Sequence, residues 1–292
     1  MRRRHLSWLA LFVVLAMVLV ACGDSTEDTA APDDGDTTAT TAAPAEDPFK
    51  IAIVAPSASN DLAFTQSIVD AVNIIKDEMG NVEVAVTDGT FIVDDAAAAI
   101  RGYADDGFDL VIAHGSQYGG PLELIAPDFP DITFAWGTAA NTFGLANVFA
   151  YEAASDEGGY VMGVMSAALS ESGTVGVVGP IEVGDAKLYV DGYAAGVMAQ
   201  DPDATVNINY IGSFSDTALA SEAAQAHAAQ GADVMSGTAQ MVVGAVGVAK
   251  DEGILWFGTQ ADQASLAPEI VVASQVYHWE VIPVSYTHLT LP

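Results

Sequence analysis

Short apolar runs and longer amphipathic segments alternate along the chain from about residue 49 onward. The first apolar run, Ile51–Ala55, ends at Pro56, and a polar loop follows it. Beyond the loop, apolar residues recur at steps of four and three, at Phe64, Ile68, Val72, Ile75 and Met79. This spacing is the period of one helical face, so the pattern predicts a strand, a loop and a helix. Because ligands of open parallel sheets bind against loops at the carboxyl ends of strands, we expect this loop to form one side of a ligand cleft.

The same alternation continues in two series. In the first, apolar runs predict strands at Val82–Val86, Leu110–Ala113, Ile132–Trp136 and Val148–Tyr151, with helices at Asp94–Asp105 and Pro121–Ala126. The second has strands predicted at Thr174–Val178, Thr205–Tyr210, Val234–Met235, Leu255–Phe257 and Ile270–Ala273, with helices at Lys187–Ala199, Thr217–Gln230 and Val243–Glu252. Val- and Ile-rich strands separated by helices indicate parallel sheets that are covered on both faces. We therefore predict an α/β protein with two doubly wound lobes and a cleft between them.

A long helix is expected to connect the two series. It spans Glu152–Ser170 and carries apolar residues on one face, at Tyr160, Val161, Val164, Met165, Ala168 and Leu169. This connection divides the chain into a first lobe at 49–151 and a second lobe at 152–273. The start of a return crossover to the first lobe is expected at 274–283.

The first residues have the form of a targeting segment. Arg2–Arg4 form a positive region, and the apolar run Leu6–Val20 is short for a membrane span. The run leads into Leu19–Gly23, which resembles the lipobox of bacterial lipoproteins, in which the residue equivalent to Cys22 carries a diacylglycerol. We expect a signal peptide at 1–22 and lipidation of Cys22, the only cysteine of the chain. An ordinary secretory signal with an incidental cysteine is the alternative.

The next segment and the overall charge narrow the class of protein. Residues 23–48 are rich in Thr, Ala, Asp and Pro without apolar periodicity, so we expect a disordered acidic tether. The whole chain has 8 basic and 39 acidic residues and a formal charge of −31. Such a charge repels phosphate backbones, so nucleic acid is not an expected partner. It is compatible with a saline habitat and equally with an ordinary acidic secreted protein.

The last residues break the pattern of the rest of the chain. Val284–Leu289 resembles the translation of a transposon-end adapter used in sequencing libraries, so we expect 284–292 to be a non-native tail. On this interpretation the C-terminal part of the first lobe, a helix and a strand, is missing, which predicts an uncovered face and poor solubility. A genuine short tail is the alternative.

Several segments, taken in order, resemble the basic membrane protein family. Its members are lipoprotein substrate-binding components of ABC importers, include bacterial purine nucleoside receptors, and have the type I periplasmic-binding-protein fold. The resemblance runs from about Lys50 to Ile282. It is carried by the segments DLAFTQS (Asp61–Ser67), YADDGFDLVIAHG (Tyr103–Gly115), VGVVGPIEV (Val175–Val183), GYAAGV (Gly192–Val197), YIGSFSD (Tyr210–Asp216), AQGADV (Ala229–Val234) and DQASLAPE (Asp262–Glu269).

The resemblance implies two aromatic ligand contacts. Members of the family place an aromatic residue from the first loop on one face of the base and another from the second lobe on the other face. Phe64 and Phe214 match those positions. An aromatic face in a desolvated cleft binds any planar ring. The alternative for each residue is an ordinary place in the core.

The polar positions implied by the resemblance depart from the nucleoside pattern. This chain has Thr65 where the family usually has Asn, and Thr138 and Gln260 where it usually has acidic residues. Gln240 begins the segment that is usually a Gly-rich turn, and Tyr277 stands in place of Lys. Asp61, Gln66 and Asp262 are retained. Neutral hydrogen-bonding groups suit a different ligand from one gripped by carboxylates and a lysine. The resemblance therefore implies a receptor, with a nucleoside as one possible solute. His114, after the third strand, is expected either to contact ligand or sense pH, or to be a satisfied histidine at a strand end.

The search for enzyme chemistry finds one candidate. The sequence has no P-loop, dinucleotide fingerprint, zinc-protease motif or paired-cysteine motif. Gly115–Gly119 fits the G-x-S-x-G pattern of a nucleophile elbow, with His227 and His278 downstream as possible triad members, although His227 is most simply a surface residue. A serine hydrolase using Ser116 is thus the alternative function.

The sequence as a whole predicts a substrate-binding protein that is not an enzyme. We expect a monomer, held by lipid on the extracytoplasmic face of the cell membrane, that closes two lobes on a small solute and delivers it to an ABC permease. No cofactor and no metal are expected. The expected ligand contacts are Asp61, Phe64, Thr65, Gln66, His114, Phe214, Gln240, Gln260, Asp262 and Tyr277.

Overall fold

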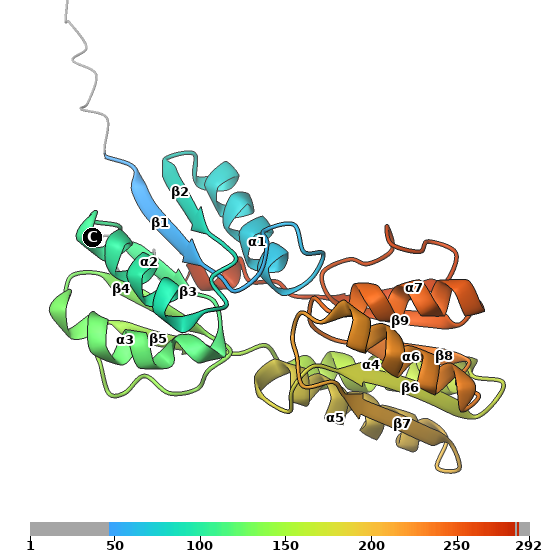
Figure 1. Ribbon diagram of the computed structural model, residues 1–292. Coiled ribbons are helices and arrows are strands. Elements are labelled where there is room, and N and C mark those ends of the chain that lie inside the picture. The colour runs from blue at the N-terminus through green and yellow to red at the C-terminus, as the bar shows by residue number, and fades with distance from the viewer. Residues whose placement is uncertain (1–46, 284, 286–292) are drawn as a thin grey trace, which may run out of the picture. The chain divides into compact units, whose positions relative to one another are not determined.

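A computed structural model describes residues 47–283 and residue 285, which belong to one compact unit (Figure 1). The expected signal peptide, the lipidation site at Cys22 and nearly all of the expected tether lie outside the described residues. The expected tail at 284–292 also lies outside them, apart from Ser285.

The first sheet has five parallel strands in the order β2-β1-β3-β4-β5 (Figure 1). They are β1 (Phe49–Val54), β2 (Val82–Thr87), β3 (Leu110–Ala113), β4 (Thr133–Gly137) and β5 (Val148–Tyr151). The connections contain α1 (Phe64–Met79), α2 (Val93–Asp105) and α3 (Gly119–Ile125), which follows the short 3₁₀ turn η1 (Ser116–Tyr118). All strands expected in the first series are therefore confirmed.

Alternation along β1 shows why this sheet is covered on both faces. Ile51 and Ile53 pack with Ile68 of α1, whereas Ala52 and Val54 belong to the core shared with α2 and α3. All four β1 side chains are fully buried. Side chains of a strand alternate between faces, so an unbroken apolar run requires a helix on each side.

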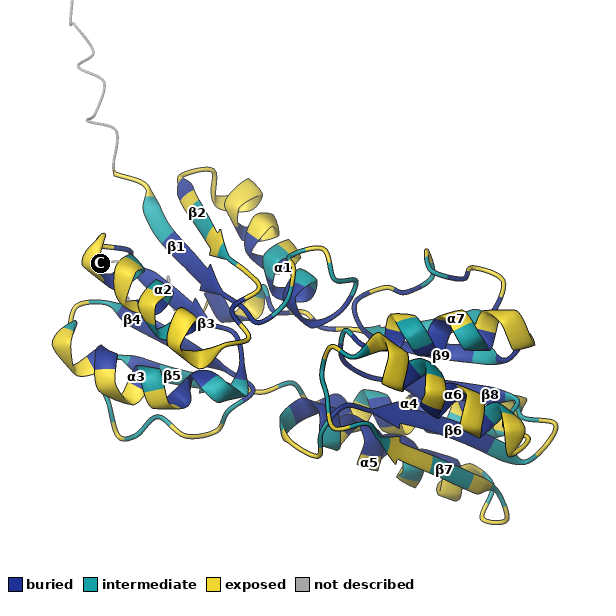
Figure 2. Ribbon diagram, in the orientation of Figure 1, coloured by how far each residue is buried: buried dark blue, intermediate teal, exposed yellow. Residues whose placement is uncertain are grey.

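The second sheet repeats this topology, with strand order β10-β9-β8-β6-β7 and all pairs parallel. Its strands are β6 (Thr174–Gly179), β7 (Thr205–Tyr210), β8 (Val234–Gly237), β9 (Leu255–Gln260) and β10 (Val271–Val276). Its helices are α4 (Ser155–Leu169), α5 (Gly184–Gln200), α6 (Thr217–Ala229) and α7 (Val242–Glu252). Figure 2 shows buried central strands in both sheets, edge strands β2 and β7 that are largely exposed or half-buried, and helices whose outer faces are exposed.

The chain returns to the first sheet after β10. This strand ends at Val276, three residues beyond the predicted end at Ala273. Trp279 and Ile282 then pack in the core that contains Ile51 and α1, and the Trp279 indole Nε1–H donates to Ser67 Oγ over 2.8 Å. The return segment therefore covers part of the α1 side of the first sheet.

Helix α4 buries a different face from the apolar face expected for it. Tyr160, Val161, Met165 and Leu169 are all exposed, whereas Gly159, Gly163 and Ser166 are buried. A Cβ on Gly163 would lie 2.0 Å from the carbonyl oxygen of Tyr193 on α5, and one on Gly196 would lie 2.0 Å from that of Tyr160. The apolar pattern was a poor guide here because the small residues let the two backbones approach within contact distance.

Candidate ligand-binding site

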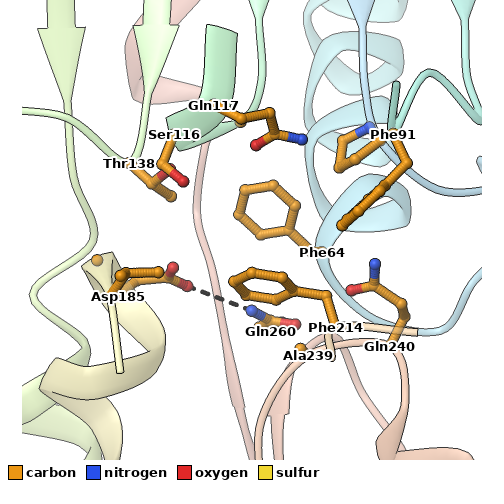
Figure 3. Close-up of a pocket in the computed structure, with 14 residues that line it drawn as sticks. Phe64, Phe91, Ser116, Gln117, Thr138, Asp185, Phe214, Ala239, Gln240 and Gln260 are labelled. Carbon is orange, nitrogen blue, oxygen red and sulfur yellow. Dashed lines mark hydrogen bonds between the residues drawn. The ribbon is translucent and has the colours of Figure 1, made fainter. Parts of the chain in front are cut away.

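One pocket lies at the carboxyl ends of strands from both sheets (Figure 3). Its lining comes from the segments that follow β1, β2, β3 and β4 in the first sheet and β6, β7, β8 and β9 in the second. This is the expected place for a ligand, because each sheet reverses its winding direction between its first and third strands. The lining residues are Pro56, Phe64, Phe91, Gly115, Ser116, Gln117, Thr138, Val183, Gly184, Asp185, Phe214, Ala239, Gln240 and Gln260.

Three phenylalanine rings enter this pocket. Phe64 begins α1 and Phe214 lies in the segment between β7 and α6, so the two expected aromatic contacts come to one pocket from different lobes (Figure 3). Phe91, in the loop after β2, is 48% exposed and lies 6.5 Å from Phe214 between ring centroids. The sequence reasoning missed Phe91, because its loop has no periodic pattern.

His114 lies behind Phe64 and does not line the pocket. It is fully buried, and its ring stacks on the Phe64 ring. Desolvation lowers its pKa to about 3, although the bond to the Phe64 carbonyl opposes this shift. The imidazole is therefore neutral at ordinary pH, which favours the satisfied-histidine interpretation over ligand contact or pH sensing.

The remaining expected residues of the first loop hold the loop and the helix start. The Asp61 carboxylate accepts hydrogen bonds from the amides of Ala63, Thr65 and Gln66, at the amino end of α1. An anion there is favoured by the unpaired amides and the helix dipole. The Thr65 side chain is fully buried, with its hydroxyl 2.7 Å from that of Ser57. Asp61, Thr65 and Gln66 thus support Phe64 from outside the pocket lining.

A buried acid lies on the second-lobe side of the pocket. Asp185, in the first turn of α5, is 6% exposed, and its Oδ2 accepts from Tyr277 Oη at 3.0 Å and Gln260 Nε2 at 3.2 Å. Desolvation raises the pKa of Asp185, and the bonds from Tyr277 and Gln260 oppose this shift. Tyr277 therefore reaches the pocket only through Asp185. The sequence reasoning missed Asp185, since nothing in its spacing separates it from the other acids.

A second acid lies close to Asp185. Oε1 of Glu152 would be 3.7 Å from a Cβ built on Gly184, the neighbour of Asp185. Desolvation, and then the charge of Asp185, raise the pKa of Glu152 to about 7. Glu152 is exposed, so solvent screens part of this repulsion. Asp262, by contrast, is an exposed residue that accepts a hydrogen bond from the Ala264 amide and does not line the pocket.

Three lining residues have left-handed backbone conformations without being glycine. They are Thr138 with φ 56°, Ala239 with φ 75° and Gln260 with φ 70°, and each lies at or just after the carboxyl end of a strand. Such conformations cost L-residues about 1–2 kcal/mol each. Strained backbone of this kind is concentrated at functional sites, which supports the assignment of this pocket.

The triad required for a hydrolase at Ser116 is not formed among the described residues. Ser116 lines the pocket, but His227 is buried on α6, where its Nε2 lies 3.2 Å from the Val177 carbonyl oxygen. His227 is thus a core residue rather than a surface one, because Gly176 leaves room for its ring. His278 is exposed and pairs with Glu280 at 2.9 Å.

The described residues contain neither a metal cluster nor a membrane-spanning helix. Within residues 47–283 and 285, no group of three or more His, Cys, Asp or Glu side chains is arranged to hold a metal ion. In the same part of the chain, no helix combines the length and apolar character needed to cross a membrane.

Comparison with known proteins agrees with this architecture. The family model described as "ABC transporter substrate-binding protein PnrA-like" matches residues 49–290. A relative from Brucella abortus, named a purine-binding protein, is 28% identical over 236 residues, which cover 80% of this chain and 67% of the relative.

Solved structures share the fold. A solute-binding protein of an ABC transporter system from Conexibacter woesei has a TM-score of 0.67 at 26% identity, covering 82% of this chain and 80% of that one. A solute-binding protein from Aeropyrum pernix has a TM-score of 0.72 at 22% identity, and the match covers 83% of this chain and 70% of that one. The type I periplasmic-binding-protein fold is thereby confirmed. With the family model matching nearly all of the described residues, the chain belongs to the PnrA-like family of ABC transporter substrate-binding proteins.

Proposed function

We propose that this protein is a lipid-anchored, extracytoplasmic receptor that binds a planar solute between Phe64 and Phe214 and delivers it to an ABC permease. The observation that carries this proposal is the pair of phenylalanine rings, one from each lobe, that line a single pocket at the carboxyl ends of the strands. Substrate-binding proteins of this family bind small solutes outside the cytoplasm and work with ABC permeases.

A nucleoside is one candidate for the solute. The Brucella abortus relative is named a purine-binding protein, and a purine is planar and suited to stacking on aromatic rings. The polar side chains in the pocket do not point to one nucleoside: Ser116, Gln117, Thr138 and Gln240 all offer neutral hydrogen bonds. The solute class is therefore best defined by the flat ring.

A ligand panel tests the proposed function. The full chain is mixed with nucleosides, bases, sugars and vitamins, and its melting temperature is measured with each. Binding to the folded state stabilises it, so one planar solute should raise the melting temperature. Phe214→Ala should reduce that rise at the same ligand concentration. A panel in which only non-planar sugars stabilise the protein, or a rise of equal size in Phe214→Ala, would contradict the proposal.

The lipid anchor has its own test. We propose that the Cys22 thiol carries the lipid, so Cys22→Ala should move the protein from the membrane fraction to the soluble fraction of a bacterial host. Metabolic labelling with a fatty acid should mark the unchanged protein and leave the variant unlabelled. Equal labelling of both proteins would contradict this part of the proposal.

A further inference from the structure

Asp185 is the only ionisable residue among those that line the pocket. Its side chain points into the pocket beside Gln260 (Figure 3). No basic side chain balances it, because the ion pairs of the described residues join other groups. Lys187, two residues further along α5, pairs instead with Asp191 on the exposed side of the helix.

The neighbours of Asp185 give this carboxylate hydrogen bonds but no counter-ion. Its hydrogen-bond donors are all neutral: the side chains of Tyr277 and Gln260 and the backbone amides of Asp185 and Ala186 at the start of α5. Glu152 adds a second acid nearby. A buried carboxylate without a counter-ion is costly, because hydrogen bonds from neutral groups replace only part of its hydration. Burial therefore favours a proton on this carboxyl while the pocket is empty, and a cationic ligand can take the place of that proton.

A second acceptor lies next to this carboxylate. Gln260 is 2% exposed, and its Oε1 has no hydrogen-bond partner in the described part of the chain. The donation of Nε2 to Asp185 fixes the orientation of the amide and leaves Oε1 as the free atom. Two acceptors side by side, one of them a carboxylate, match a ligand group that carries N–H donors and positive charge.

The aromatic residues suit the same kind of group. Phe64, Phe91 and Phe214 line the pocket, and the face of an aromatic ring attracts a cation by about 0.5–2 kcal/mol. An acid together with several aromatic rings binds a flat cation better than a neutral ring of the same shape, because both kinds of contact gain from the charge.

We propose that the solute is a planar organic cation, whose ring lies against Phe64 and Phe214 and whose charged N–H group is held by Asp185 and Gln260. This inference rests on the proposed function and narrows it from any flat solute to a positively charged one. It also explains why a lining that is otherwise neutral contains one buried acid.

Matched ligand pairs test the inference on the unchanged protein. Benzamidine and benzamide have nearly the same shape, but only benzamidine is a cation at neutral pH, and 1-methyladenosine and adenosine form a second pair of this kind. Isothermal titration with the full chain should show at least tenfold tighter binding of the cation in each pair. In Asp185→Asn, which keeps the size of the side chain and removes its charge, this preference should become markedly smaller, because only the aromatic rings then favour the cation.

Asp262→Asn is the matched control, because it removes an equal charge from an exposed acid outside the lining. It should keep the full preference for the cation. Tighter binding of the neutral members, or an unaltered preference in Asp185→Asn, would overturn the inference and leave the proposed function intact. Absence of binding by every planar solute, charged or neutral, would overturn both. The comparison of ligand pairs on the unchanged protein remains decisive even if a variant does not fold.

Discussion

The ring of Phe64 lies on the imidazole of His114, with ring centroids 3.9 Å apart and an angle of 17° between the planes. Nε2 of His114 lies 3.3 Å from the Phe64 carbonyl oxygen, which can only accept, so Nε2 carries the proton. Nδ1 then accepts from the Tyr151 hydroxyl at 2.6 Å. A buried, neutral imidazole thus supports the ring that we propose contacts the solute.

This arrangement predicts a loss of stability in acid. Folding lowers the pKa of His114 from 6.5 to about 3, so the unfolded chain binds the proton more readily than the folded chain between these values. The contribution to the free energy of unfolding is present above pH 6.5 and is lost as the pH falls toward 3. In His114→Gln, denaturant titrations should show a smaller decrease in stability from pH 7 to pH 4 than in the unchanged protein.

His278→Gln is the control for this experiment, because His278 is exposed. Its stability should follow that of the unchanged protein across the same range. A His114→Gln curve parallel to that of the unchanged protein would show that the imidazole is not the titrating group.

Loss of either proposed stacking ring should weaken binding without unfolding the protein. Stacking of a base on an aromatic ring contributes about 1–3 kcal/mol, so Phe64→Ala or Phe214→Ala should raise the dissociation constant by roughly 5- to 150-fold. Phe129→Ala provides the control, since Phe129 is partly exposed like Phe214 but lies outside the pocket. Equal affinity of all three variants, measured by calorimetry, would refute the aromatic pair.

Glu152 should make the protein less stable as the pH rises. Its pKa is raised in the folded state from 4.5 to about 7, so the folded chain holds this proton more tightly than the unfolded chain. The resulting stabilisation is present below pH 4.5 and is lost as the pH rises through 7. The difference in melting temperature between Glu152→Gln and the unchanged protein should therefore shift in favour of the variant from pH 5 to pH 8. A constant difference would show that folding does not raise the pKa of Glu152.

Two glycine substitutions should have opposite effects on stability. Gly163→Ala places a Cβ 2.0 Å from the Tyr193 carbonyl oxygen, so α4 and α5 must separate, at a cost of about 1–3 kcal/mol. Gly247→Ala, inside α7, meets no atom within 4 Å and should gain about 0.5–1 kcal/mol from the reduced freedom of the unfolded chain. Urea denaturation measures both. Equal stability of the two variants would contradict the close packing of α4 on α5.

The regular elements were well predicted because their signal is local. The apolar run at Ile51–Ala55 and the helical spacing that begins at Phe64 each identify an element without knowledge of any distant contact. The buried face of helix α4 was predicted wrongly because glycines on both helices, Gly163 of α4 and Gly196 of α5, form its contact with α5. The close approach of Gly163 to Tyr193, and not the spacing of the apolar residues, then decides which face of α4 is buried.

The candidate site was predicted only in part. Of the ten expected ligand contacts, Phe64, Phe214, Gln240 and Gln260 line the pocket. Asp61, Thr65, Gln66 and His114 instead hold the first loop and the Phe64 ring. Loop residues that support a contact residue and those that touch the ligand have the same polar character in a sequence. Their roles differ only in the direction of the side chain, which the packing of the loop determines.

By itself, the sequence determined the alternation of strands and helices, the two wound sheets and the placement of ligand loops at the carboxyl ends of strands. These follow from hydrophobic periodicity and from the right-handed crossover that connects parallel strands. Only the tertiary structure distinguished Asp185 from the other acids of the chain. Asp185 differs from those acids because it is buried and accepts hydrogen bonds from Gln260 and Tyr277, which are distant in the sequence. No local sequence pattern indicates either feature.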